Sequence, residues 1–536
     1  MKLALSINRL LIFMLYATSI FAYSQQFTDA HIVTKWIFVG IIICIIGLYN
    51  SVLVTNSNGY LKENILLLEA IIPLCLLQAV YGILQYWGLL SSHSLLEITG
   101  SFDNPAGFAA CLCSGLPFIG FLLSNNSKYI RCTGWIVGII IAMAIILSGS
   151  RAGIVSIAMA VVVFLFQRLN RRRYVWKYVL LVSTILLFIA CYWAKKDSAD
   201  GRLLIWQCSI NMVKDAPLFG HGIGSFEACY MDYQAEFFKT HETNRYSMLA
   251  DNVKHPFNEY ICVLLNFGIV GLMILLIFVF FLVWCYGKKT DKEKRIAAYV
   301  LFSIGIFSLF SYPFMYPFTW IVTFICIYFI IKDQIKNLLV MSGVKDVICV
   351  IVFIGSFWGI YKLIDCIQTE KAWTEVSELS LAGKYKEVLP VYKVLEGKLT
   401  NDPYFLYNYA AILLAAKQYE ESLKIALRCR RYWADYDLEL IIGENYQRLK
   451  QPEHAALYYN SAALMCPSRF LPHYKLFFLY KENGENKRMI EVAETIIRKP
   501  IKIKTPAILM MKREMKKEKL QVMNKLMSIR DTDEEY

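Results

Sequence analysis

Three short segments combine cations, glycines and a histidine in patterns that could act on an anionic substrate. Arg151 lies in the run Ser-Gly-Ser-Arg-Ala-Gly, Arg202 follows Asp-Gly, and His255 opens the run His-Pro-Phe-Asn-Glu-Tyr. A guanidinium group presents a planar fork of donors that suits phosphate or pyrophosphate. Histidine is a usual general base near neutral pH. These residue types predict a catalytic site in which two cations hold a phosphorylated substrate and an imidazole removes a proton.

Polar and glycine-rich segments near these residues extend the candidate site. Asn258 and Glu259 follow His255 closely, and another asparagine lies upstream in the run Gly-Ser-Phe-Asp-Asn-Pro-Ala-Gly. The loop between Arg202 and His255 carries a Gly-x-Gly-x-Gly run, but no strand precedes it, as a nucleotide-binding fold would require. We expect this loop to approach a lipid-borne phosphate instead. The predicted substrate-binding residues are Asn104, Gly222, Gly224, Asn258 and Glu259.

Each catalytic candidate also has a purely structural interpretation. Arg151 could extend to the membrane interface without binding a substrate. Residues 202–213 are expected to form an amphipathic helix on the membrane that begins at Arg202, with Leu203, Trp206, Ile210 and Val213 facing lipid. This segment could also be a purely structural membrane-surface loop. His255 could be a packed histidine, as we expect for most of the other six histidines.

The composition excludes several classes of protein. Hydrophobic residues make up 57% of the 536 residues and charged residues 18%, against about 25% charged residues in soluble domains. A soluble enzyme and a disordered chain are therefore excluded. The net charge of +14 gathers in short connections, which argues against a nucleic-acid partner. The 15 cysteines form no Cys-x-x-Cys pair and the outward loops have no Asp-x-Asp, so we predict no metal and no cofactor.

Apolar segments of membrane-spanning length dominate the chain up to about residue 365. Basic residues gather in the connections 125–131, 168–177, 287–295 and 332–345, whereas 88–104 has none. With an inside N-terminus, the positive-inside rule places all four basic connections in the cytoplasm. The first segment could instead be a cleaved signal peptide. We predict eleven spans, at about 8–23, 32–54, 64–87, 105–124, 132–149, 152–168, 175–194, 258–286, 296–312, 316–331 and 346–364.

The C-terminal part shows an internal repeat of 33–34 residues that resembles the tetratricopeptide repeat, a helix-turn-helix unit. Such an array could stabilise or dimerise the protein, or it could bind a polypeptide acceptor or an assembly partner. The aligned small or apolar positions are Val376, Ala410, Gly443 and Phe477, then Val388, Ser422, Ala455 and Met489, then Leu395, Cys429, Ala462 and Ile496.

These patterns predict an all-α protein with three parts. Residues 1–365 form a polytopic membrane bundle whose long outer loop, about 195–257, carries two of the three catalytic candidates. Residues 366–519 form the helical repeat solenoid, and 520–536 form a polar tail. With eleven spans, the long loop and everything after residue 365 lie outside.

The order of these motifs along the chain resembles the order found in members of the O-antigen ligase/polymerase superfamily. This superfamily includes lipopolysaccharide O-antigen ligases, Wzy-type polymerases and bacterial protein O-oligosaccharyltransferases. The resemblance covers roughly residues 60–335, is strongest over 148–272, and continues after the histidine into the run Asn-Phe-Gly-Ile-Val-Gly that ends at Gly271. One departure is that members often have His-x-His-Asn, whereas His255 is followed by Pro-Phe-Asn. If the second histidine is the family's base, Glu259 is the substitute we predict.

The resemblance implies a GT-C-like membrane glycosyltransferase in the bacterial inner membrane. It implies transfer of a glycan from an undecaprenyl-diphosphate donor to an acceptor hydroxyl at the periplasmic face, without a metal. Arg151 and Arg202 would bind the pyrophosphate, and His255 would deprotonate the acceptor. The acceptor could be lipid A core or a protein Ser or Thr, and a possible protein partner would bind the repeats. Alternatives are a Wzy-type polymerase, a transporter of a lipid-linked glycan or anion, and a non-catalytic scaffold.

Overall fold

The computed structural model describes residues 2–53, 68, 70–91, 98–168, 174–241, 245–288, 291–339 and 342–533. These residues form helices and turns and contain no strand, which confirms the predicted all-α class. The chain divides into two compact units. The first comprises 1–194, 257–260 and 272–375, and the second comprises 195–256, 261–271 and 376–536.

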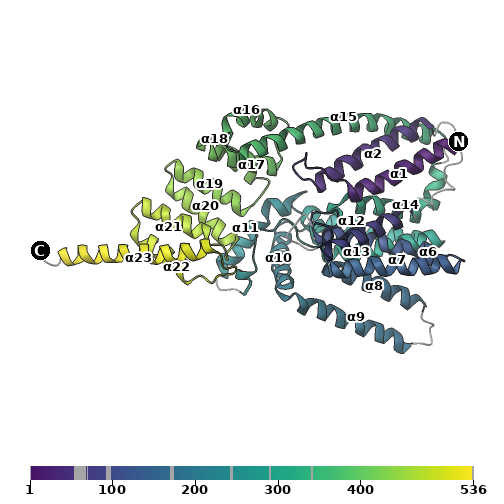
Figure 1. Ribbon diagram of the computed structural model, residues 1–536, viewed down its shortest axis with the longest axis horizontal. Helices are drawn as coiled ribbons and strands as arrows, with labels where there is room; N and C mark the ends of the chain where they lie inside the picture. The colour runs from purple at the N-terminus through teal and green to yellow at the C-terminus, as the bar shows by residue number, and fades with distance from the viewer. Residues whose placement is uncertain are drawn as a thin grey trace. The chain divides into compact units, whose positions relative to one another are not determined.

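Helices occupy most of the described residues of each predicted span (Figure 1). Residue 54 of the second predicted span and residues 64–67 and 69 of the third lie outside the described residues. By length and composition, six helices in the described ranges can cross a membrane: parts of α2, α14 and α15, all of α7 and α12, and the continuous stretch from α5 to α6. The remaining predicted spans fall on α1, α4, α8, α9 and α13. The bounds are α1 Lys2–Phe21, α2 Ile32–Leu53, α4 Ile71–Tyr86, α5 Pro105–Gly115, η2 Leu116–Ile119, α6 Gly120–Leu123, α7 Lys128–Leu147, α8 Arg151–Arg168, α9 Tyr174–Ala194, α12 Glu259–Lys288, α13 Lys292–Ser308, η4 Pro313–Met315, α14 Pro317–Leu339 and α15 Ser342–Leu381.

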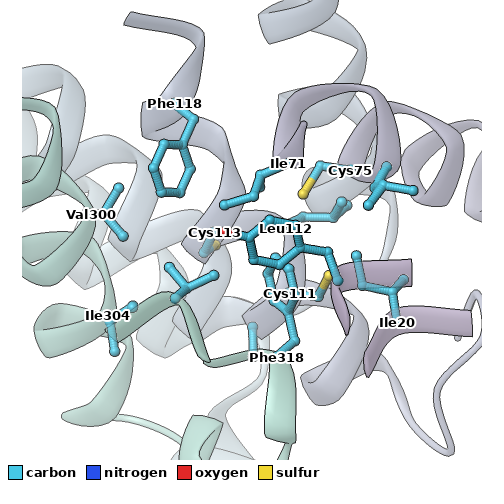
Figure 2. Packing of buried hydrophobic residues seen from close by; sticks show 14 of the residues in the cluster. Ile20, Ile71, Cys75, Cys111, Leu112, Cys113, Phe118, Val300, Ile304 and Phe318 are labelled. Atoms are coloured by element: carbon cyan, nitrogen blue, oxygen red, sulfur yellow. The ribbon is translucent and has the colours of Figure 1, made fainter. Parts of the chain in front are cut away.

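The core of the first unit is built around α5, whose residues are buried from Gly107 to Gly115. Figure 2 shows Leu112 of α5 among side chains of α4 and α13, including Ile71 and Val300. A helix that is apolar on all sides belongs inside a bundle. Cys111 and Cys113, at 1% exposure each, pack here as small hydrophobic side chains.

Polar contacts mark both ends of the first unit. At one end Lys294 of α13 pairs with Asp333 of α14 at 2.8 Å, and Lys292 donates to the Phe121 carbonyl at 3.1 Å. At the other ends of α5 and α14, the Tyr316 hydroxyl donates to Asp103 at 3.0 Å. The chain segments at the ends of α6, α12 and α14 therefore meet at one end of the unit, whereas the cytoplasmic placement of the basic connections stays a prediction.

The repeat region of the second unit is a row of antiparallel helix pairs (Figure 1). The turn residues Gly383, Lys417, Lys450 and Gly484 all have positive φ, and they are spaced 34, 33 and 34 residues apart. Every aligned position named above, from Val376 to Ile496, is buried. The helices are α16 Tyr385–Glu396, α17 Pro403–Ala415, α18 Tyr419–Arg430, α19 Tyr436–Arg448, α20 Pro452–Met465, α21 Leu471–Glu482, α22 Asn486–Arg498 and α23 Pro506–Asp533. The assignment to the tetratricopeptide family stays a prediction.

The long loop lies in the second unit, together with the repeat array and residues 261–271 of α12. Its two helices are α10 (Lys196–Asp215) and α11 (Ser225–Thr240), and α11 packs against α20. The compact units therefore differ from the linear division at residue 365, which α15 crosses without interruption. Because two segments in direct contact cannot be separated by a bilayer, the loop and the array lie on the same side of the membrane.

Candidate active site

Helix α10 carries Arg202 on an amphipathic surface. Leu204, Cys208 and Met212 are buried, whereas Leu203 and Ile210 are exposed, as a lipid-facing strip requires. The helix begins at Lys196, six residues before the predicted start. This extension places Arg202 in the second turn of the helix rather than at its start.

Trp206 differs from the lipid-facing role predicted for it. Its indole Nε1 donates a hydrogen bond of 2.9 Å to the carbonyl of Pro256. A tryptophan N–H away from water needs an acceptor, and the residue after His255 supplies one. Arg202 is four residues before Trp206 and therefore lies on the same face, one helical turn away. This bond brings the chain carrying His255 to the face of α10 that carries Arg202.

His255 is half-buried in the second unit. Burial lowers the pKa of its imidazole to about 4, and the neighbouring ammonium group of Lys254 acts in the same direction. The ring is therefore neutral at physiological pH, which is the form that accepts a proton. Helix α12 begins only at Glu259, four residues after His255.

We expect this low pKa to set the acid limb of the pH profile. Activity should persist as the pH falls towards about 4 and should then decline, because protonation removes the base. Lys254→Gln should raise the pKa of His255 and move the acid limb to higher pH, since it removes a nearby positive charge. The measurement is kcat/KM against pH for both proteins. An acid limb at the same pH in the variant would contradict this role of Lys254.

The glycine run closes a break in helix α12. At Gly268 the backbone leaves the helix, with φ 64° and ψ −161°. The Ile269 and Val270 amides donate to the carbonyls of Pro217 and Leu218 at 2.8 and 3.1 Å. In return, the amides of residues 221 and 222 donate to the carbonyls of residues 265 and 266, at 2.8 and 3.1 Å. We call this pairing of residues 217–222 with 265–270 the clasp; it satisfies backbone groups that the break would otherwise leave unpaired.

The clasp explains why the glycines are needed. Gly220, Gly222 and Gly224 all have positive φ, which favours glycine. A Cβ on Gly220 would lie 2.6 Å from the Leu265 carbonyl oxygen, whereas Gly222 and Gly224 have open space around that position. The amide of Gly222 is bonded to the carbonyl of Asn266, so it is used in the clasp.

The other predicted binding residues lie at the ends of helices in the first unit. The Asn104 side chain caps α5 by accepting from the Gly107 amide at 2.9 Å. Asn258 accepts from the Tyr260 amide at 2.9 Å, and Glu259 accepts from the Phe314 amide at 3.2 Å. Each side chain therefore has a structural role at a helix end.

Arg151 is the first residue of α8 and is half-buried. The turn before it contains Gly149, with φ 65°, and the Ser150 hydroxyl accepts from the Gly153 amide at 3.3 Å. A Cβ on Gly153 would lie 2.7 Å from Ile145 Cγ2. The glycines thus allow α7 and α8 to meet in a tight turn, and Arg151 follows that turn at the helix N-terminus.

The structure groups the sequence candidates by unit. The second unit holds Arg202, Gly222, Gly224 and His255, and the first holds Asn104, Arg151, Asn258 and Glu259. In the described part of the chain, no three His, Cys, Asp or Glu side chains are placed to hold a metal ion. Sequence reasoning missed the Trp206–Pro256 bond, although the spacing of four residues from Arg202 placed Trp206 on the relevant face.

Two comparisons match this region. The family model described as O-antigen ligase matches residues 136–276, which include every candidate site residue except Asn104. A Rickettsia typhi protein with the provisional name of polysaccharide ligase is 25% identical over 281 residues. That alignment covers 47% of this chain and 62% of the relative, so the chain spans less than two thirds of the protein it matches. The matched segment and its relative confirm the resemblance to the O-antigen ligase superfamily that the sequence motifs indicated.

Proposed function

We propose that this protein is a membrane glycosyltransferase of the O-antigen ligase type. It transfers a glycan from an undecaprenyl-diphosphate donor to an acceptor hydroxyl of lipid A core or protein at the periplasmic face of the bacterial inner membrane. The observation that carries the proposal is the Trp206–Pro256 hydrogen bond, which links the helix of Arg202 to the segment of His255 within the matched domain.

The proposed reaction needs a base and a stabilised leaving group. Neutral His255 takes the proton of the acceptor hydroxyl, and the oxygen attacks the anomeric carbon of the glycan. The bond between that carbon and the diphosphate breaks, and undecaprenyl diphosphate leaves with the electron pair. Arg151 and Arg202 stabilise the charge that develops on the diphosphate. Attack from the opposite face inverts the anomeric centre.

Two alternatives remain open to test. A Wzy-type polymerase would use the same chemistry with a second lipid-linked glycan as the acceptor. A transporter is favoured by one feature, the break in α12, because transporters place their sites at interrupted membrane helices. In this protein, however, the clasp joins the break to the loop that carries Arg202.

A reconstitution assay separates these functions. Purified protein in vesicles with an undecaprenyl-diphosphate glycan should form glycosylated product only when a matching acceptor is added, and should release undecaprenyl diphosphate in equal amount. Lengthening of the donor glycan without any other acceptor would instead identify a polymerase. Movement of the donor across the bilayer with no new glycosidic bond would identify a transporter and contradict the proposal.

A further inference from the structure

The short segment before His255 is held by side chains of the repeat array. Asp251 accepts from Arg469 Nη2 at 2.7 Å. The next residue, Asn252, donates through Nδ2 to Asp435 Oδ2 at 2.6 Å. These contacts fix two consecutive residues, only three and four positions before the proposed base.

Lys254 and Gln234 add to the same contact. The ammonium of Lys254 lies 4.6 Å from the ring centroid of Tyr404 and 5.0 Å from that of Trp433, which are cation–π distances. Buried Gln234 of α11 donates both to the Asp251 carbonyl, at 3.1 Å, and to the Met465 carbonyl of the array, at 2.6 Å. Three of the four residues before His255 thus contact the array, directly or through Gln234.

The contacts on the array come from helix ends in successive repeats. Asp435 caps α19, Tyr404 lies in the first turn of α17, and Arg469 precedes α21. Elsewhere on the same edge, Arg430 pairs with Asp232 of α11, and the Ala434 amide donates to the Glu227 carbonyl at 2.9 Å. The loop therefore occupies a continuous edge of the array.

The type of contact suggests a role in positioning. Exposed ion pairs contribute little to stability, and Arg469 and Asp251 are 39% and 51% exposed. Four separate contacts on one short segment instead restrict its backbone, which fixes the direction from which His255 enters the site. A displacement of about 1 Å at a catalytic group can cost on the order of a hundredfold in rate.

We infer that the repeat array is an internal brace for the proposed base, with Asp435 and Arg469 as positioning residues. This inference rests on the proposed function. It means that the edge of the array that contacts the loop binds the protein's own chain and not an acceptor protein. The array therefore acts on catalysis from outside the membrane bundle, through the segment 251–254.

The Asn252–Asp435 pair allows a reciprocal test. Asn252→Asp places two carboxylates against each other, so we expect kcat to fall by about tenfold or more with little change in KM. Asp435→Asn still offers a side-chain oxygen to cap α19, and in the double variant its amide can donate to the carboxylate introduced at position 252. The double variant should therefore recover kcat to within about threefold of wild type.

Hydrogen exchange of the peptide covering 251–256 gives a second readout that does not depend on activity. Exchange should rise in Asn252→Asp and return to the wild-type level in the double variant. Asn460→Asp, which adds the same charge at an exposed position of α20, is the matched control and should change neither measurement.

The two readouts separate the two claims. One outcome is that the wild-type protein forms no glycosidic product while the double variant still restores wild-type hydrogen exchange. That combination would keep the brace and reject the proposed function. Unchanged kcat and exchange in Asn252→Asp would overturn the brace. A double variant no better than Asn252→Asp in either readout would also overturn it.

Discussion

Arg151→Ala, Arg202→Ala and His255→Ala should each reduce glycan transfer by about a hundredfold or more in the reconstituted assay. Removing one group that stabilises transition-state charge typically costs about 10²–10³ in kcat. The loss of the base should leave donor binding intact, whereas the loss of either arginine should also weaken it. The measurement is product formation at saturating acceptor, with donor binding determined separately.

Two further substitutions sharpen this prediction. Arg202→Lys keeps the charge but loses the bidentate fork, so it should restore only part of the activity. Arg245→Ala is the matched control, because Arg245 lies in the same loop but packs over the ring of Tyr246. Full activity in His255→Ala would remove this residue as the base and leave Glu259 as the candidate.

Replacing Gly268 by alanine should destabilise the protein by roughly 3 kcal/mol or more. Its φ of 64° with ψ of −161° lies in a region that is essentially restricted to glycine, and such strain costs on the order of 1–3 kcal/mol. In addition, the new Cβ would lie 2.3 Å from the Leu218 carbonyl oxygen and 2.6 Å from the Phe219 amide nitrogen. Because these are backbone atoms, the clasp must open to admit the methyl group.

For Gly268→Ala we expect a lower midpoint of thermal unfolding in detergent and faster proteolysis of the loop between α10 and α11. Gly287→Ala is the matched control, since Gly287 lies in the same helix with open space around its Cβ position. It should be neutral or slightly stabilising, because alanine favours helix more than glycine does. An unchanged midpoint in Gly268→Ala would show that the clasp is not required for stability.

Local patterns predicted the helices and the repeat well. Apolar runs marked the membrane helices because spanning length is a property of contiguous sequence. The twelve aligned small or apolar positions of the repeat, which recur every 33–34 residues, are all buried because each repeat uses the same packing geometry. The predicted start of the loop helix was late by six residues because Lys196 and Asp197 continue α10 before its amphipathic part begins.

Contacts between distant segments could not be predicted from the sequence. The indole of Trp206 resembled a lipid-facing side chain because nothing in its neighbourhood revealed Pro256 as an acceptor. The break at Gly268 was hidden inside a continuous apolar run, since periodicity cannot distinguish a straight helix from one interrupted by a single residue. Asp435 and Arg469 gave no signal, because their partners lie in the loop of the preceding membrane domain.

The braced loop has a consequence for how the chain matures. Asn252 and Asp435 are 183 positions apart, and Gln234 and Met465 are 231 positions apart. The ribosome therefore completes the loop long before it makes the surfaces that the loop contacts, and α12 to α15 are synthesised in between. Loop closure over such separations is slow compared with local helix formation. The contacts of segment 251–254 with the array can therefore form only after residues 404–469 have been synthesised and have reached the same compartment, which makes this packing a late step in the maturation of the chain.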